Sequence, residues 1–102
     1  MQASNSTAEI AAVFKALADP NRLAILQLLR ECCGESCRFE PGEEGETVSE
    51  IARRFDLALS TVSHHLKELR NAGLIDCVKR GQWVYCTPNR DVLARLRTFL
   101  EG

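Results

Sequence analysis

The sequence predicts a mainly α-helical domain with one β-hairpin, in the order α-α-α-α-β-β-α. Two observations predict it: apolar residues recur at helical spacing in five segments, and two short β-type runs flank Arg80–Gly81 near the C-terminal end. The chain has 102 residues, of which 45% are hydrophobic and 26% charged. These values fit one globular domain with one modest core.

The first two helices are predicted on either side of "DPNR". Residues 8–18, "AEIAAVFKALA", carry an apolar stripe at i, i+3, i+4 and i+7: Ile10, Val13, Phe14 and Leu17. Asp19 can cap the next helix, and Pro20 suits the first position of that helix. That helix runs to about Cys33 and is apolar around most of its circumference, so we expect it to be central and buried. Gly34 is suited to end it.

Residues 34–46 have no apolar period and form an acidic loop that contains cysteine. "TVSEIARRF" then predicts a third helix, since Thr47 and Glu50 have the spacing of a capping box. The link "DLAL" leads to Ser60, a candidate N-cap for "STVSHHLKELRNAG", a helix ending at Gly73. "LIDCVKRGQWVYCT" predicts the hairpin and "RDVLARLRTFLEG" the last helix.

The overall net charge of −1 looks unfavourable for a protein that binds nucleic acid, but the charges are unevenly distributed. Residues 31–50 hold seven acidic residues and one basic residue, which leaves twelve basic against seven acidic residues, or +5, in the remainder. Local positive charge attracts phosphates, so the composition does not exclude DNA.

Other partners and compartments are disfavoured. No stretch approaches the roughly 18 apolar residues of a membrane span, and "MQASNSTAEI" has no basic, apolar secretory signal. Five cysteines without such a signal indicate reduced thiols rather than a disulfide framework. We therefore expect a cytoplasmic protein.

The helix that begins at Ser60 has two different faces. At ~100° per residue, Val62, Leu66, Leu69 and Gly73 gather on one side. The opposite side is polar and carries Ser60, Thr61, His64, Lys67 and Asn71. Such hydrogen-bonding groups are what a helix needs to enter the major groove. A merely solvated surface is the alternative, but the preceding helix, the short link and the following hairpin favour a winged helix-turn-helix DNA-binding domain over residues 1–102.

Individual residues receive different predicted roles. His64 points away from the apolar stripe and is predicted to contact DNA, whereas His65 lies toward the stripe and is predicted to be a packed structural residue. Lys67 and Arg70 are predicted to bind phosphates.

The hairpin tip is also basic. Lys79, Arg80 and Gln82 surround the turn, from which they could reach the DNA backbone or the adjacent minor groove. A charged turn that only protects a strand edge is the alternative.

Three motifs, "FKALADPNRLAILQLL", "LSTVSHHLKELRNAGLI" and "GQWVYCT", resemble the ArsR/SmtB family of small bacterial and archaeal repressors. The resemblance implies a homodimer whose first and last helices form the interface. It implies that Ser60, Ser63 and His64 occupy base-contacting positions and that Lys79 and Arg80 lie in the wing. It also implies repression of operons for metal or metalloid export, with an inducer that releases double-stranded operator DNA.

The sequence departs from the two familiar sensing sites of this family. The helix "TVSEIARRF" has no cysteine, and "RDVLARLRTFLEG" has Asp91 and Glu101 but no histidine. Neither site can be carried over to this chain.

A different cluster, Cys32, Cys33 and Cys37, could bind a thiophilic ion. Three thiolates suit As(III) or Sb(III), and a fourth ligand would suit Zn(II), Cd(II) or Pb(II). The alternative is that Cys33 packs under its helix and Cys37 is incidental. Oxidation or persulfidation of the same thiols is a further alternative, as is a regulator without any inducer. The acidic residues of the loop are interpreted as a solvated insertion.

Cys77 and Cys86 are predicted to be hairpin core residues. With Arg80–Gly81 at the tip, Cys77 would face Val84 and Cys86 would face Ile75, so that the two thiols are diagonal neighbours on one side. A redox pair is the less favoured interpretation. Because the chain lacks Cys-x-x-Cys spacing and a βαβ pattern, we do not expect an oxidoreductase or any other enzyme.

Overall fold

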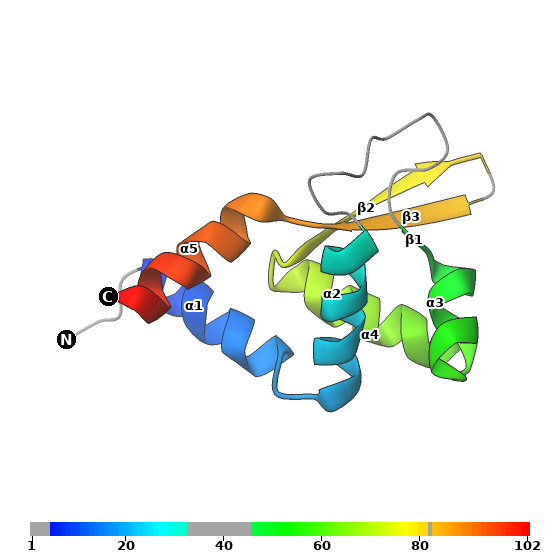
Figure 1. The fold of residues 1–102 in the computed structure, drawn as a ribbon, viewed down its shortest axis with the longest axis horizontal. Helices are drawn as coiled ribbons and strands as arrows, with labels where there is room; N and C mark the ends of the chain where they lie inside the picture. Colours follow the sequence, from blue (N-terminus) through cyan, green and yellow to red (C-terminus); the bar gives the residue numbers. More distant parts are fainter. Residues whose placement is uncertain (1–4, 33–45, 82) are drawn as a thin grey trace.

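The computed structural model describes residues 5–32, 46–81 and 83–102 (Figure 1). In chain order the elements are α1 (Asn5–Ala16), α2 (Pro20–Cys32), β1 (Glu46–Thr47), α3 (Val48–Phe55), α4 (Leu59–Asn71), β2 (Ile75–Arg80), β3 (Trp83–Pro88) and α5 (Arg90–Glu101). The predicted order is confirmed, with the addition of the short strand β1 where the loop 34–46 was expected to continue. Gly34 lies outside the described residues. Across the described part of the chain, every helix is too short or too polar to cross a bilayer.

The predicted cap at Asp19 is confirmed. Its Oδ1 accepts hydrogen bonds from the backbone N–H groups of Asn21, at 2.8 Å, and Arg22, at 3.2 Å. The N–H of Arg22 contributes most to holding the pKa of the Asp19 carboxyl below its usual range. Helix α2 starts at Pro20, directly after this cap. Helix α1 ends at Ala16, two residues before the predicted boundary.

The link between α3 and α4 is tighter than predicted. Thr47 caps α3 as expected, its Oγ1 accepting from the N–H of Glu50 at 3.2 Å. Asp56, at φ 51°, reverses the chain, and the N–H of Leu57 donates to the Ala52 carbonyl at 3.0 Å. After this turn, Ala58 is the extended N-cap residue of α4, and it makes no side-chain hydrogen bond to the helix. The prediction that Ser60 caps the helix is therefore wrong.

The end of α4 passes directly into the hairpin. Gly73 has φ +79°, a conformation that L side chains rarely adopt. Its N–H donates to the Arg70 carbonyl at 2.9 Å, and the N–H of Leu74 donates to the Leu69 carbonyl at 3.0 Å. This closing pattern satisfies the last carbonyls of the helix and starts β2 at Ile75.

The sheet has the antiparallel order β1-β3-β2. Arg80 pairs with Trp83, so two residues separate the strands, and Gly81, the first of them, has the positive φ, +61°, that a short hairpin connection favours. Cys77 consequently pairs with Cys86 directly. The predicted register, with Cys77 facing Val84 and Cys86 facing Ile75, is wrong because it placed the turn one residue too early. The prediction that both thiols share one side holds.

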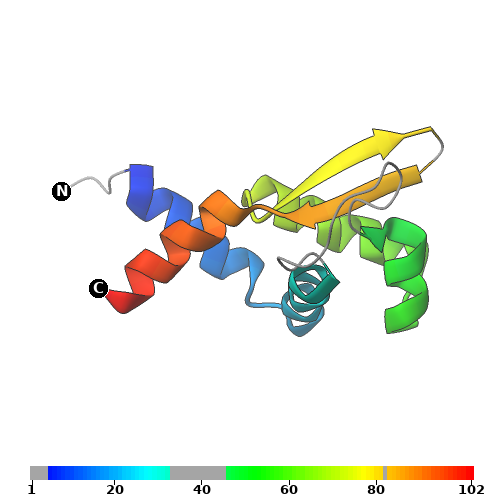
Figure 2. The same cartoon turned by 45° about the horizontal axis from the view of Figure 1, so that its top comes forward.

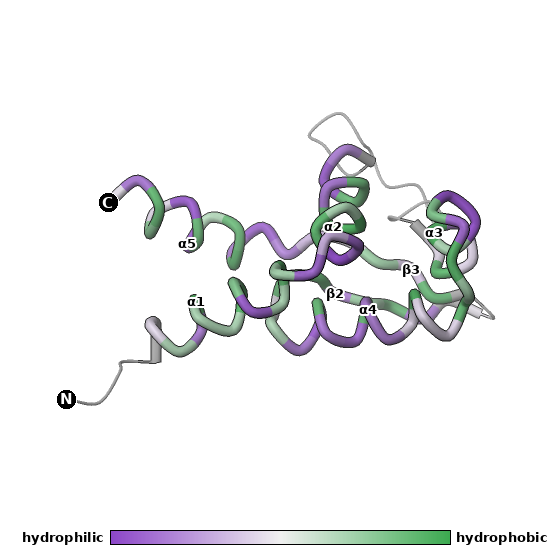
Figure 3. The backbone as a smooth tube through the Cα atoms, turned by 90° about the horizontal axis from the view of Figure 1, so that it is seen from below, coloured by the Kyte–Doolittle hydropathy of each residue, from purple (hydrophilic) through white to green (hydrophobic). Residues whose placement is uncertain are grey.

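The core joins α2, α3, α4 and the sheet, with a contribution from α1. Its buried members are Val13, Ala16, Ile25, Leu26, Leu29, Ile51, Val62, Leu66, Leu69, Leu74, Ile75 and Cys86. The predicted burial of the second helix is correct only on one side, since Leu23 is 48% exposed. Helices α1 and α5 lie side by side at the end remote from the hairpin tip (Figures 1, 2 and 3).

Candidate nucleic-acid interface

The two faces predicted for α4 are present in the structure. Val62, Leu66 and Leu69 are at most 4% exposed and pack into the core. The outer side carries exposed side chains: Ser60, Thr61, Ser63, His64, Lys67 and Asn71. We call these six residues the polar face of α4. It combines hydroxyl, imidazole, ammonium and amide groups on one rigid element, which can hydrogen-bond to base edges and phosphates.

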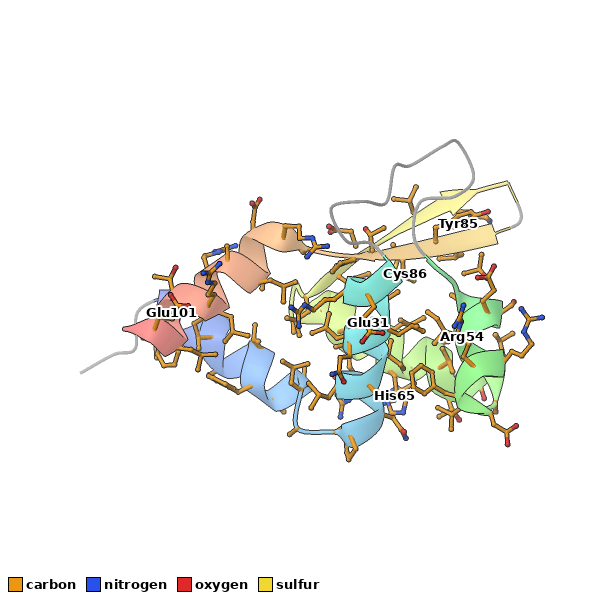
Figure 4. The ribbon with its side chains drawn as sticks, in the orientation of Figure 1. Glu31, Arg54, His65, Tyr85, Cys86 and Glu101 are labelled. Carbon is orange, nitrogen blue, oxygen red and sulfur yellow. The ribbon has the colours of Figure 1, made fainter. Side chains whose placement is uncertain are left out.

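The adjacent histidines differ in burial, as predicted. His64 is exposed, whereas His65 is 8% exposed and lies on the inner side of α4 near Asp19, at the start of α2 (Figure 4). Their ring centroids are 6.1 Å apart. Nδ1 of His65 has no hydrogen-bond partner among the described residues. His64 alone is therefore available to an external ligand.

The orientation of α4 is fixed mainly by core packing and secondarily by charge. Arg22 of α2 lies 3.8 Å from the Glu68 carboxylate of α4 and 3.9 Å from the Asp19 carboxylate. At these distances and partial exposures each pair contributes at most about 1 kcal/mol. The polar face is thus presented by a helix whose position the apolar side determines.

The hairpin, which we call the wing, lies beside this surface. Its tip and the N-terminal part of α4 lie toward the same end of the molecule (Figures 1 and 2). Lys79 is exposed on β2, and Arg80 ends that strand. Gln82 lies outside the described residues. The predicted neighbourhood of the basic residues and the turn is therefore present for Lys79 and the backbone of Arg80, although the turn lies one residue later than predicted.

The predicted thiol cluster lies at the limit of the described chain. Cys32 is the last residue of α2, while the side chain of Cys32 and the whole of Cys33 and Cys37 lie outside the described residues. Within the described ranges, no group of three or more His, Cys, Asp or Glu side chains could hold a metal ion. The cluster stays a sequence-based prediction.

The direct pairing of the wing cysteines was missed by sequence reasoning. Cys77 Sγ and Cys86 Sγ are 3.3 Å apart, and both thiols are free. The hydrogen bond between them lowers the pKa of Cys77 to about 7, against the opposing effect of burial. The same hydrogen bond and burial raise the pKa of Cys86. Gly81, with its freedom of φ, was the sequence signal that could have given the correct register.

Comparison with known proteins places this surface in a family context. Residues 17–78 match a family model described as a helix-turn-helix domain. The transcriptional repressor SdpR of Bacillus subtilis is 36% identical over 81 residues, which cover 79% of this chain and 77% of that protein. The cadmium resistance regulator CadC of Listeria innocua is 34% identical over 83 residues, covering 81% of this chain and 60% of CadC.

A solved structure supports the same assignment. It is a homodimeric winged helix-turn-helix DNA-binding domain from Mycobacterium bovis, described as an ArsR-family candidate, with TM-score 0.70 and 30% identity over 99% of this chain and 85% of that one. These relatives are regulators rather than enzymes. The chain belongs to the ArsR family of winged helix-turn-helix transcriptional repressors.

Proposed function

We propose that this chain is a homodimeric repressor that binds operator DNA through the polar face of α4 and leaves it when a thiophilic metal or metalloid binds a cysteine cluster. The observation that carries the proposal is that helix α4 has one apolar side and one polar side. Its apolar side packs into the core, while the side chains of its polar face are exposed.

The DNA contacts follow from side-chain chemistry and position. Ser60, Thr61, Ser63 and His64 lie in the N-terminal half of α4, the part of a recognition helix that meets base edges. Lys67 and the wing cations Lys79 and Arg80 would bind phosphates, and Gln82 would reach the groove beside the wing.

The dimer is proposed to form through α1 and α5. Phe14, Phe99 and Leu100 are 45%, 58% and 65% exposed. Phe14 and Phe99 meet edge to face at 6.0 Å between ring centroids. The Arg95 guanidinium donates to the Glu9 carboxylate at 2.6 Å, which ties α5 to α1. A second copy would bury this apolar surface and supply a second α4, about 34–36 Å away along the DNA.

The inducer is proposed to bind Cys32, Cys33 and Cys37. Three clustered thiols favour As(III) or Sb(III), and the similarity to a cadmium resistance regulator keeps Cd(II) in the same class. An inducer that changes DNA affinity by about 5–150-fold would couple the two sites by about 1–3 kcal/mol.

Fluorescence anisotropy with DNA from the region upstream of the gene tests the DNA proposal. His64→Ala should weaken binding to the preferred sequence by about 1–3 kcal/mol and relax its specificity. Lys67→Ala should weaken binding to all sequences and reduce the salt slope by about 1. Arg97→Ala on α5, which also removes one exposed positive charge, is the matched control. Equal effects of Lys67→Ala and Arg97→Ala, or binding to no upstream fragment, would contradict the proposal.

Titration of the protein–DNA complex with arsenite, antimonite, Cd(II), Pb(II) and Zn(II) tests the inducer. Release in the wild type and its loss in Cys37→Ser would support the cluster. An equal response in both proteins eliminates it, and no response to any ion would indicate a regulator without metal input. Peroxide and polysulfide in the same assay test the oxidation alternative.

A further inference from the structure

The wing cysteines occupy the cross-strand position at which the two backbones come closest. Hydrogen-bonded and non-hydrogen-bonded pairs alternate along an antiparallel ladder. The N–H of Asn89 donates to the Leu74 carbonyl at 2.8 Å, so Leu74 and Asn89 form a hydrogen-bonded pair of this ladder. Cys77 and Cys86 lie three pairs further along, so they form a non-hydrogen-bonded pair, with Cα atoms about 4.5 Å apart.

That geometry is within the range of a disulfide. Bridged cysteines have Cα atoms about 4.4–6.8 Å apart, so the backbone need not move. The two Sγ atoms, now 3.3 Å apart, would have to approach to about 2.0 Å by side-chain rotation. Since the hairpin already holds both residues, this pair can close without help from another segment.

The two thiols differ in exposure and charge in the way that a reactive and a resolving cysteine differ. Cys86 is fully buried beside α2 (Figure 4), while Cys77 is half-buried. The Cys86 hydrogen bond and the neighbouring Arg70 guanidinium lower the pKa of Cys77 to about 7. The thiolate is the reactive form of cysteine, so Cys77 is the thiol that an oxidant would meet first.

We propose that Cys77 and Cys86 form a reversible disulfide when the protein meets a hydroperoxide, giving the wing a redox input separate from the cluster at Cys32. The Cys77 thiolate attacks the peroxide, the O–O bond breaks, and the oxygen that leaves is protonated to water or an alcohol. Cys77 becomes a sulfenic acid. The Cys86 sulfur then attacks the Cys77 sulfur, forming the S–S bond while the hydroxyl leaves as water with the Cys86 proton.

The disulfide would act on DNA binding through α4. Arg70 belongs to α4 and faces the Cys77 thiolate of β2. Oxidation removes that negative charge next to Arg70 and links the two wing strands covalently beside the recognition helix. We expect DNA affinity to fall about fivefold or more. This consequence rests on the proposed function, whereas disulfide formation does not.

The test uses the full chain carrying Cys32→Ser, Cys33→Ser and Cys37→Ser, so that the wing cysteines are the only thiols. After hydrogen peroxide, the free-thiol count should fall by two per chain, and mass spectrometry should show one intrachain link between Cys77 and Cys86 that dithiothreitol reverses. Adding Cys86→Ser, which keeps a hydrogen-bond donor beside Cys77, should instead leave a sulfenic acid at Cys77 that dimedone traps. Should Cys86→Ser fail to fold, Cys77→Ser at the half-buried position serves, with no link and no trapped sulfenic acid.

Thiols that resist peroxide, or links formed only between chains, would overturn the proposal. Anisotropy on the same samples separates its two parts. If the reduced protein binds no DNA yet the link forms, the proposed function fails and the redox site stands. If the reduced protein binds DNA and no link forms, the redox site fails. A Cys77–Cys86 disulfide that leaves DNA affinity unchanged would overturn the proposal that oxidation of the wing regulates DNA binding.

Discussion

Helices α4 and α5 are nearly equal in length, with 13 and 12 residues, but they relate to the core in opposite ways. Helix α4 buries Val62, His65, Leu66 and Leu69, whereas α5 buries no residue within the protomer. Yet α5 is the helix with a side-chain cap, since Asn89 Oδ1 accepts from the Val92 N–H at 3.0 Å. Packing, rather than local signals, therefore determines which helix the fold depends on.

The difference in burial between α4 and α5 matches the roles proposed for them, DNA binding for α4 and dimerisation for α5. The apolar side of α4 is satisfied inside the protomer, so its polar face is free for DNA. The apolar side of α5 is only partly covered, and its last turns leave Phe99 and Leu100 exposed. The apolar side of α4 is therefore buried within the protomer, whereas α5 keeps exposed apolar side chains that the proposed dimer would bury.

The largest effect is expected in the core of α4. Leu69 is fully buried, so Leu69→Ala should reduce the free energy of unfolding by about 2–5 kcal/mol, measured by urea denaturation. Leu100→Ala, which truncates the same residue type at a position 65% exposed, is the matched control. Its cost should appear only where the dimer is populated. Equal destabilisation of both variants at all protein concentrations would remove the distinction between the helices.

The next largest effect is expected at the end of α5. Phe99→Ala removes an exposed ring that contacts Phe14, and the loss of an aromatic residue from an interface commonly costs about 2 kcal/mol or more. The dimer dissociation constant should therefore rise about thirtyfold or more in sedimentation equilibrium. Arg97→Ala, with its side chain 78% exposed on the same helix, should change it little. An unchanged constant for Phe99→Ala would mean that α5 is not in the interface.

Sequence periodicity was most reliable where burial and local signals agree. The caps at Asp19 and Thr47 were predicted correctly because an acceptor side chain precedes a suitable first turn. Burial of His65 followed from its angle to the apolar stripe. The solvated outer side of α4 was predicted from the same stripe.

The errors arose where tertiary geometry decides. β1 is only two residues long and exists because β3 offers it an edge, so no periodicity could reveal it. The cysteine register depended on which residue takes the first turn position, and several residues of "VKRGQW" were compatible with a turn. The start of α4 was displaced by the turn at Asp56, whose positive φ no residue pattern required.

The smallest effect is expected at the first residues of α4, where this helix lacks the side-chain cap that α5 has. Ala58 has the extended conformation of an N-cap, φ −61° and ψ 145°, but offers no acceptor to α4. Ala58→Ser should therefore stabilise the fold by about 0.5–1 kcal/mol in urea denaturation, bringing α4 to the capped condition of α5. Ser60→Ala, in contrast, should leave stability nearly unchanged and weaken DNA binding, because Ser60 lies within the helix on its polar face. If Ser60→Ala costs as much stability as a lost cap, about 1 kcal/mol, then Ser60 is the N-cap of α4 and does not belong to the polar face proposed to contact DNA.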